Sequence, residues 1–375
     1  MCRHDSNKRF SILAIGLIMT SASAMAGEKT GWNARSAARY LDGRAAEWAA
    51  FKGADRGQGA DKISCLSCHT SLSYALGRPA LRHVAGEDRP ASHETRLLEQ
   101  VRRRVAHWGE LDTPRYRLSY DHDEKKKVES WGTEAVLNAL VLAWDDRRRE
   151  LAAPTDSTKD ALRHLWATQC KDGPEAGSWD WLDFGLRPWE AGEARYYGTT
   201  LAAIALGAAP GYLKGADSSD ARAGIDPLRR YLNTHLDQQN LHNRIFALWA
   251  STSIDGMLTA GQRKAIVEKV LAKQQENGGW SLSSLVDCRR HDGTPQETAA
   301  DGYATGLAVH VLQLAGVHRE QPAVSRGLAW LRANQQPAGN WIGVSLNKRR
   351  DPKTHVGKFM SDSATAFAIL ALEPR

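Results

Sequence analysis

The chain has 375 residues, of which 42% are hydrophobic and 25% are charged, with a formal net charge of +7. No stretch beyond the N-terminal region approaches the roughly 20 consecutive apolar residues that a transmembrane helix needs. The basic residues are scattered, and no nucleic-acid-binding motif accompanies them. Composition and charge therefore disfavour both a membrane-spanning mature protein and a nucleic-acid partner.

The first 26 residues have the pattern of an export signal. Arg3, Lys8 and Arg9 give a positive start, residues 10–19 form a short apolar run, and residues 24–26 form a small-residue cleavage site. Cleavage would remove three basic residues and one acidic residue, leaving a net charge of +5. We expect a periplasmic or secreted protein, residues 27–375. In such a compartment Cys170 and Cys288 could form a disulfide or remain buried thiols.

The segment CLSCH is the first motif of the mature chain that carries chemistry. Cys65, Cys68 and His69 have the C-x-x-C-H spacing at which two thiols attach a haem and the histidine binds its iron. Export is consistent with this, because covalent haem attachment in bacteria takes place outside the cytoplasm. Two other interpretations stay open: a disulfide beside an incidental histidine, and a metal site, such as zinc, completed by a carboxylate.

A second axial ligand for such an iron is not evident from the spacing. A small cytochrome c supplies a methionine some tens of residues after the motif, but this chain has none between Met25 and Met257. The candidates are methionines, histidines or no ligand at all: Met257, Met360, His83, His93, His107, His122 and His242. An open iron position would favour catalysis or gas binding over electron transfer.

Two kinds of helix pattern alternate along the chain. Amphipathic patterns cover residues 37–50, 92–108, 157–168, 225–236, 260–273 and 323–333. Between them lie segments that are apolar nearly all round, at residues 67–81, 131–144, 197–206, 240–250, 303–314 and 363–372. A helix that is apolar on every side is buried on every side. The alternation predicts an all-α fold, an α/α toroid of about six outer and six inner helices in one domain.

Local signals refine this prediction. Thr259 followed by Gln262, and Ser157 followed by Asp160, indicate capped starts of two outer helices. By the same repeat logic, the CLSCH segment opens the first inner helix.

The turns after the outer helices repeat a Q-x-x-x-G-x-W pattern. It is found at Gln274, Gly278 and Trp280, and again at Gln335, Gly339 and Trp341. A third copy keeps Gln169 and Gly173 but inserts residues before Trp179. We expect the glycine to end the outer helix while Gln and Trp connect the turn to the neighbouring helix pair.

These repeats, with DGYATGLAVHVLQLAG and SDSATAFAILALE, resemble the QW repeats of the squalene–hopene cyclase and protein prenyltransferase superfamily. The resemblance implies a central apolar cavity with catalytic groups at its mouth, where the inner helices begin. The segment KISCLSCHTSLSYALGRPALR also resembles exported bacterial toroid proteins that carry C-x-S-C-H-T.

The catalytic motifs of that superfamily are incomplete here. A cyclase needs Asp-x-Asp-Asp, because a primed carboxylic acid protonates the alkene, but this chain has Asp301-Gly302-Tyr303-Ala304. A prenyltransferase-like zinc site matches only at Asp301, with Asp362 on the next inner helix. The acidic stretch 121–124 is read first as a solvated helix start.

The resemblance places other candidate site residues at the same mouth. Asp301, Tyr303, Asp362, Glu129 and His242 are candidate catalytic groups, and Tyr196 and Tyr197 are candidate substrate-binding groups.

The leading hypothesis is an exported haem c oxidoreductase or redox protein that acts on, or senses, an apolar isoprenoid-like molecule. A redox partner would accompany that function. The alternatives are a cyclase- or transferase-like enzyme with a metal at the mouth, and a non-catalytic toroid that binds a lipid or a partner protein.

Overall fold

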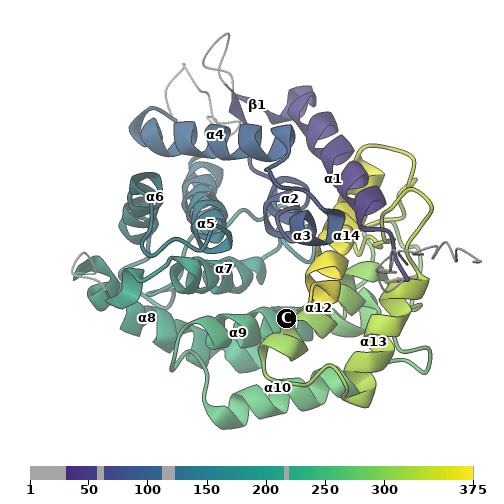
Figure 1. Ribbon diagram of the computed structural model, residues 1–375. Helices are drawn as coiled ribbons and strands as arrows, with labels where there is room; N and C mark the ends of the chain where they lie inside the picture. The colour runs from purple at the N-terminus through teal and green to yellow at the C-terminus, as the bar shows by residue number, and fades with distance from the viewer. Residues whose placement is uncertain (1–30, 57–62, 112–122, 215–218, 375) are drawn as a thin grey trace, which may run out of the picture. The chain divides into compact units, whose positions relative to one another are not determined.

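Figure 1 shows a computed structural model of the chain, which describes residues 31–56, 63–111, 123–214 and 219–374. The expected export signal, residues 1–26, lies outside these ranges, as does His122. Gly31–Arg375 form one compact unit. None of the described helices is long and apolar enough to cross a membrane.

An inner set of helices forms a closed cycle. Each inner helix contacts the next along the chain, and the last one contacts the first. Most of their residues are buried, as expected for segments that are apolar all round. The set comprises α2 (Ser71–Gly77), α5 (Glu124–Arg148), α7 (Ala194–Ala208), α9 (Leu241–Ser253), α12 (Gly302–Leu314) and α14 (Phe359–Leu372).

An outer helix precedes each inner one and surrounds this cycle (Figure 1). The outer set comprises α1 (Ala34–Ala49), α4 (Ser92–Ala106), α6 (Asp156–Ala167), α8 (Ser219–His235), α10 (Ala260–Ala272) and α13 (Pro322–Ala333). The predicted all-α toroid is confirmed. Its alternating outer and inner helices correspond one by one to the two kinds of pattern in the sequence.

Short elements connect the long helices. They are α3 (Leu81–Ala85), α11 (Leu282–Leu285), the 3₁₀ turns η1 (Lys52–Ala54), η3 (Trp108–Glu110), η4 (Tyr212–Lys214), η5 (Leu236–Gln238) and η6 (Val356–Lys358), and two strands. The strands β1 (Asp55–Arg56) and β2 (Ile63–Ser64) pair antiparallel directly before CLSCH.

The prediction that CLSCH opens the first inner helix is wrong, because α2 begins only at Ser71. The side chain of Ser67 accepts hydrogen bonds from the backbone N–H groups of Thr70 and Ser71, at 3.1 and 2.9 Å. A serine bonded in this way favours a turn before the helix over helix at its own position. The motif therefore lies in a turn between β2 and α2.

The Gln of the QW turns acts as predicted, because Gln274 donates to the carbonyl of Ala323 on the next outer helix, α13 (2.8 Å). The indole of Trp280 instead donates back to the carbonyl of Val270 on α10, the helix before the turn (2.7 Å). The last copy closes the toroid, because Gln335 donates to the carbonyl of Asn33 at the start of α1 (3.0 Å).

The prediction for the glycine needs correction. The repeat glycines lie within the turns at positive φ and do not end the outer helices. In the copy that begins at Gln169, the repeat glycine is Gly177, not Gly173. A Cβ on Gly177 would lie 2.2 Å from the carbonyl oxygen of Pro227, whereas a Cβ on Gly173 would meet no atom within 4 Å.

The two predicted caps differ in outcome. Thr259 and Gln262 form the reciprocal capping pair of α10. Ser157 is not a cap, because α6 starts earlier and Thr155 accepts from the backbone N–H of Thr158.

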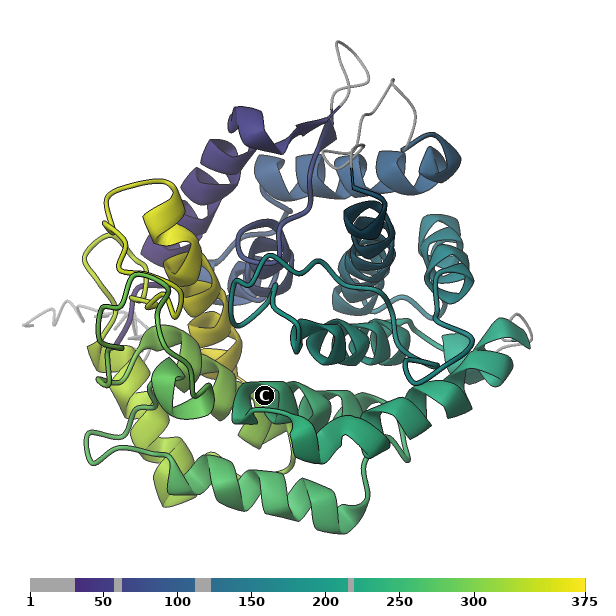
Figure 2. The same cartoon turned by 180° about the vertical axis from the view of Figure 1, so that it is seen from behind.

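Aromatic side chains fill the middle of the toroid, where the resemblance implied an apolar cavity. Phe367 of α14 lies 5.4 Å from Tyr303, 6.0 Å from Phe246 and 6.2 Å from Trp249, measured between ring centroids. In Figure 2 the teal connection between α6 and α7 runs across this interior at one end. The candidate site therefore has to be sought at that end and not within the helix cycle.

Candidate functional site

The turn that carries CLSCH is held by α1 and η1. The backbone N–H of Cys65 donates to Ala54 (2.8 Å), and Trp48 of α1 donates to the carbonyl of Cys65 (2.8 Å). Cys65 and Cys68 are both free thiols, so the disulfide interpretation of the motif is not realised in this structure. Cys68 is buried and Cys65 is partly exposed.

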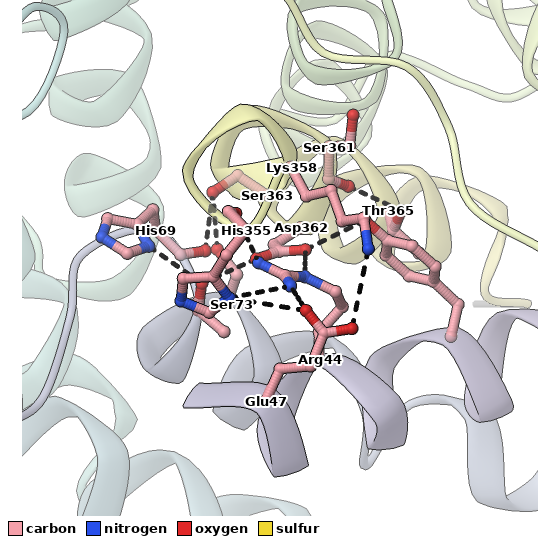
Figure 3. Close-up of polar contacts among 12 residues, drawn as sticks. Arg44, Glu47, His69, Ser73, His355, Lys358, Ser361, Asp362, Ser363 and Thr365 are labelled. Atoms are coloured by element: carbon pink, nitrogen blue, oxygen red, sulfur yellow. Dashed lines mark hydrogen bonds and ion pairs between the residues drawn. The ribbon is translucent and has the colours of Figure 1, made fainter. Parts of the chain in front are cut away.

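His69 stands at the end of a hydrogen-bonded chain. The Thr70 hydroxyl donates to Asp362 of α14 (2.6 Å), and Nδ1 of His69 lies 2.8 Å from the same hydroxyl. Asp362 also receives two hydrogen bonds from Arg44 of α1, at 2.7 and 3.0 Å, and one from Tyr40. Figure 3 shows Asp362 between Arg44 and the His69 segment.

This chain fixes the tautomer of His69. The Thr70 hydroxyl donates its one hydrogen to Asp362. Toward His69 it can therefore only accept a hydrogen bond, so Nδ1 of His69 carries the imidazole proton. Nε2 then has a free lone pair. Burial, with the nearby charges of Arg44 and His355, lowers the pKa of His69 to about 3. The ring is thus neutral and able to bind a metal through Nε2.

The hydrogen-bonded series from His69 to Arg44 extends through ion pairs to the more exposed Glu47. Arg44 also pairs with Glu47 and donates to the carbonyl of His355 (3.1 Å). Lys358 lies 3.6 Å from Glu47, as Figure 3 shows. These contacts join α1 to η6.

Aromatic contacts and a hollow define the other surroundings of His69. Its ring stacks on Phe359, with centroids 3.6 Å apart and planes 16° apart. Its ring also borders a small hollow that is partly open to solvent. The other walls include Leu186, Trp189, Glu190, Met360 and the cations Arg187 and Arg350.

Cys68 lies beside the same hollow through its contact with Glu190. Burial raises the pKa of the Cys68 thiol, and it also raises the pKa of the Glu190 carboxyl to about 7. Tyr197 and Tyr303 lie near enough to Cys68 to interact with it electrostatically.

A second hydrogen-bonded chain begins at the wall of the hollow. Trp189 donates to the hydroxyl of Tyr303 (3.0 Å), which lies 2.8 Å from Nε2 of His242. Burial lowers the pKa of His242 to about 4. The predicted residues Tyr303, His242 and Tyr197 are therefore brought together near Cys68.

Three other predicted site residues serve structural roles. Asp301 caps α12 and accepts from the backbone N–H groups of Tyr303, Ala304 and Leu282. Tyr196 donates to the carbonyl of Leu232 on the outer helix α8. Glu129 pairs with Lys126 and accepts from the N–H of Asp183. Asp123, from the acidic stretch 121–124, caps α5.

Several residues of the site were not singled out from the sequence. Thr70 directly follows the motif, and a hydroxyl next to His69 could have indicated a hydrogen-bond partner for the imidazole. Arg44, Glu190 and Phe359 gave no signal, because their positions beside His69 depend on how α1, the α6–α7 connection and α14 meet.

The residues present fit a c-type haem only in part. His69 lines the hollow, but neither attachment cysteine does. Cys68 is buried and reaches this region only through its contact with Glu190, and Cys65 lines a neighbouring hollow with Trp48, Tyr74 and His93. Among the described residues, no three His, Cys, Asp or Glu side chains are grouped to hold a metal ion by themselves. Cys170 and Cys288 are free thiols and are not joined.

Comparison with known proteins agrees with the fold. The family described as squalene-hopene cyclase C-terminal domain matches residues 243–373, so the expected likeness to that toroid superfamily is confirmed. Among curated proteins, no relative matches the chain.

Solved structures that resemble the chain include a glucuronyl hydrolase and a glycosidase. An unsaturated glucuronyl hydrolase from Bacillus sp. GL1, responsible for the degradation of glycosaminoglycan, has 13% identity and a TM-score of 0.51, over 91% of this chain and 96% of its own. A glycosidase in complex with glucose has 12% identity and a TM-score of 0.49, over 91% of this chain and 98% of its own. Such identities show a common fold alone.

Proposed function

We propose that the protein is an exported redox protein with a c-type haem attached to Cys65 and Cys68 and bound through His69. The observation that carries this proposal is the orientation of His69. The chain Arg44–Asp362–Thr70 holds its Nδ1–H and leaves Nε2 unprotonated at a hollow. A histidine that binds a metal usually has its other ring nitrogen held in this way.

A haem bound there would supply one-electron redox chemistry. The residues of the chain would orient and tune it. Asp362 accepts a hydrogen bond from the Thr70 hydroxyl, and this hydroxyl in turn accepts from the Nδ1–H of His69. Such a chain of hydrogen bonds polarises the imidazole and makes its Nε2 a stronger metal ligand. Arg44 opposes the rise that burial causes in the pKa of Asp362 and so favours the carboxylate form that accepts from Thr70. Arg187 and Arg350 place positive charge at the rim of the hollow.

The proposal also includes a relation to the exported toroid proteins with C-x-S-C-H-T and a periplasmic or secreted location. The C-x-S-C-H-T segment supports a common origin with exported toroid proteins, and the first 26 residues support a periplasmic or secreted location. The reaction partner would be an apolar small molecule or a redox protein that approaches the open side of the hollow. The aromatic filling of the toroid favours approach there over enclosure within it.

The test is the visible spectrum and a covalent haem stain of the protein exported from a host that matures c-type cytochromes. We expect a Soret band that survives denaturation and disappears in Cys65→Ala/Cys68→Ala. The matched control is Cys170→Ala/Cys288→Ala, which also removes two free thiols and should retain the band. A colourless protein with four unmodified cysteines would overturn the proposal, and elemental analysis for zinc would follow.

A further inference from the structure

A groove of about 520 Å³ lies between α1, the QW turn that contains Gly339 and the loop that leads into α14. It shares no lining residue with the hollow beside His69. In Figure 3, two of its residues, Lys358 and Ser361, lie on the opposite side of Asp362 from His69. The volume is in the range of small-molecule binding sites. A ligand in this groove would be independent of the proposed haem.

Cations outnumber acids along the groove. The charged side chains that line it are one acid, Glu47, and four cations: Arg39, Arg44, Lys353 and Lys358. Asp362, which does not line the groove, pairs with Arg44 (2.7 Å), and Glu47 lies 3.6 Å from Lys358. These two carboxylates balance two of the four cations. Two positive charges therefore remain, which favours a dianion as the ligand.

The two unbalanced cations are able to turn toward a ligand. Arg39 of α1 and Lys353 of the loop are both exposed. Among the described residues, the guanidinium of Arg39 donates only to the Ser36 hydroxyl (2.8 Å), and the ammonium group of Lys353 has no partner. Exposed cations of this kind are common on protein surfaces, so they do not make a binding site by themselves.

A buried amide distinguishes this groove from an ordinary basic surface. Asn340 lies in the QW turn and is only 9% exposed, yet its side-chain amide has no hydrogen-bond partner in the described part of the chain. Buried amides normally have such a partner. The amide is not completely buried, so it reaches solvent at the groove that Asn340 lines. An oxygen of a bound ligand would supply the missing acceptor.

Ser361 supplies a second polar group at the groove. The hydroxyl of this buried residue accepts from the backbone N–H of Gly343 (3.2 Å) and donates to no described residue, so its hydrogen can be donated to a ligand. The apolar part of the wall includes Tyr40, whose hydroxyl donates to Asp362 (3.0 Å), and Ile342, which is 44% exposed. The groove thus offers donors to anionic oxygens and apolar contacts to a carbon skeleton.

We infer that this groove binds a small organic dianion that carries carboxylate or phosphate groups. The anionic oxygens accept hydrogen bonds from Arg39, Lys353 and the amide of Asn340. The carbon skeleton lies against Tyr40 and Ile342. Carboxylates and phosphates are the anions whose oxygens match guanidinium and ammonium donors.

Isothermal titration calorimetry of the exported protein at fixed ionic strength tests this site with two probes, citrate and inorganic pyrophosphate. We expect at least one probe to bind at one site per chain, and the tighter probe identifies the anion as carboxylate or phosphate. Arg39→Gln/Lys353→Gln should weaken binding at least about tenfold, because two charge-assisted contacts are removed. The matched control, Arg263→Gln/Lys269→Gln, removes one Arg and one Lys from exposed positions of α10 and should bind as the wild type.

Two variants of Asn340 separate a specific site from general surface charge. Asn340→Ala loses the donor and should weaken binding several-fold, and Asn340→Asp, which keeps the shape but adds a negative charge, should weaken it further. Unchanged binding in Asn340→Ala, equal weakening in the two double variants, or no binding of either probe to the wild type overturns the site. A protein without haem that binds a probe overturns the proposed function alone, and a haem-loaded protein that binds neither probe overturns this site alone.

Discussion

Asp362 is the residue on which the orientation of His69 depends. It is 1% exposed and accepts hydrogen bonds from Arg44, Tyr40 and Thr70, which come from α1 and the CLSCH turn. Burial raises the pKa of Asp362, and the hydrogen bonds and charge of Arg44 oppose that rise. The sequence offered Asp362 as a candidate catalytic group, but its contacts make it the positioning residue for His69.

Removing Asp362 should therefore affect stability as well as the site. Asp362→Ala leaves the guanidinium of Arg44 buried with only the more exposed Glu47 as a carboxylate partner. We expect a loss of about 3–5 kcal/mol in the free energy of unfolding, measured by urea titration. Asp156→Ala is the control, because its ion pair with Lys159 is solvent-exposed and should contribute less than about 1 kcal/mol. Equal losses in the two variants would contradict this account.

His242 gives the protein a pH dependence of known sign. Burial lowers its pKa to about 4 in the folded state from 6.5, so between these values the unfolded chain binds more protons. Stability is then fully present above pH 6.5 and decreases as the pH falls towards 4, by roughly 3 kcal/mol for this residue.

Urea titrations at pH 4.5 to 7.5 would measure this slope. We expect His242→Gln to reduce this slope without abolishing it, because burial also lowers the pKa of His69. His291→Gln, which removes an exposed histidine, serves as the control. A slope that is the same in His242→Gln and in the wild type would show that His242 is not the group responsible.

At the scale of elements, the QW turns connect one outer helix to the next. The carbonyl of the following outer helix or its cap accepts from Gln169, Gln274 and Gln335 in turn. The repeat glycines allow the two backbones to approach closely, since a Cβ at Gly278 or Gly339 would clash with the neighbouring helix.

The first turn contains its own control for this role. Gly177 and Gly173 both have positive φ, +95° and +72°, but only a Cβ on Gly177 would collide with backbone. We expect Gly173→Ala to cost about 1 kcal/mol from backbone strain alone, and Gly177→Ala to cost at least about 2 kcal/mol more. Thermal unfolding of the two variants decides between them. A larger loss in Gly173→Ala would restore that residue as the repeat glycine.

Much of the element pattern could be predicted from sequence, because burial on one side or on all sides leaves a clear periodicity. The starts of helices were harder where short polar residues compete for the backbone. Ser67 delays α2 to Ser71, and Thr155 rather than Ser157 caps α6. In the turn after α6 the insertion displaced the glycine, so spacing alone pointed to Gly173.

At the scale of the whole molecule, the site exists because the toroid closes. His69 lies before the first inner helix and Asp362 lies in the last, and they meet because α14 contacts α2. The resemblance to toroid proteins implied that the inner helices begin at one end of the toroid. It did not indicate which side chains pair with Asp362 or Cys68, because Arg44 comes from an outer helix and Glu190 from the α6–α7 connection. The aromatic interior was also not evident, because apolar helix patterns do not distinguish a lined cavity from a filled one.

The most direct test of the central claim is the intact mass of the protein exported from a host that matures c-type cytochromes, measured after denaturation. The account predicts the mass of the chain from residue 27 plus one haem, with the added mass absent in Cys65→Ala/Cys68→Ala. The mass of the unmodified chain, from cells that load another c-type cytochrome normally, would contradict it.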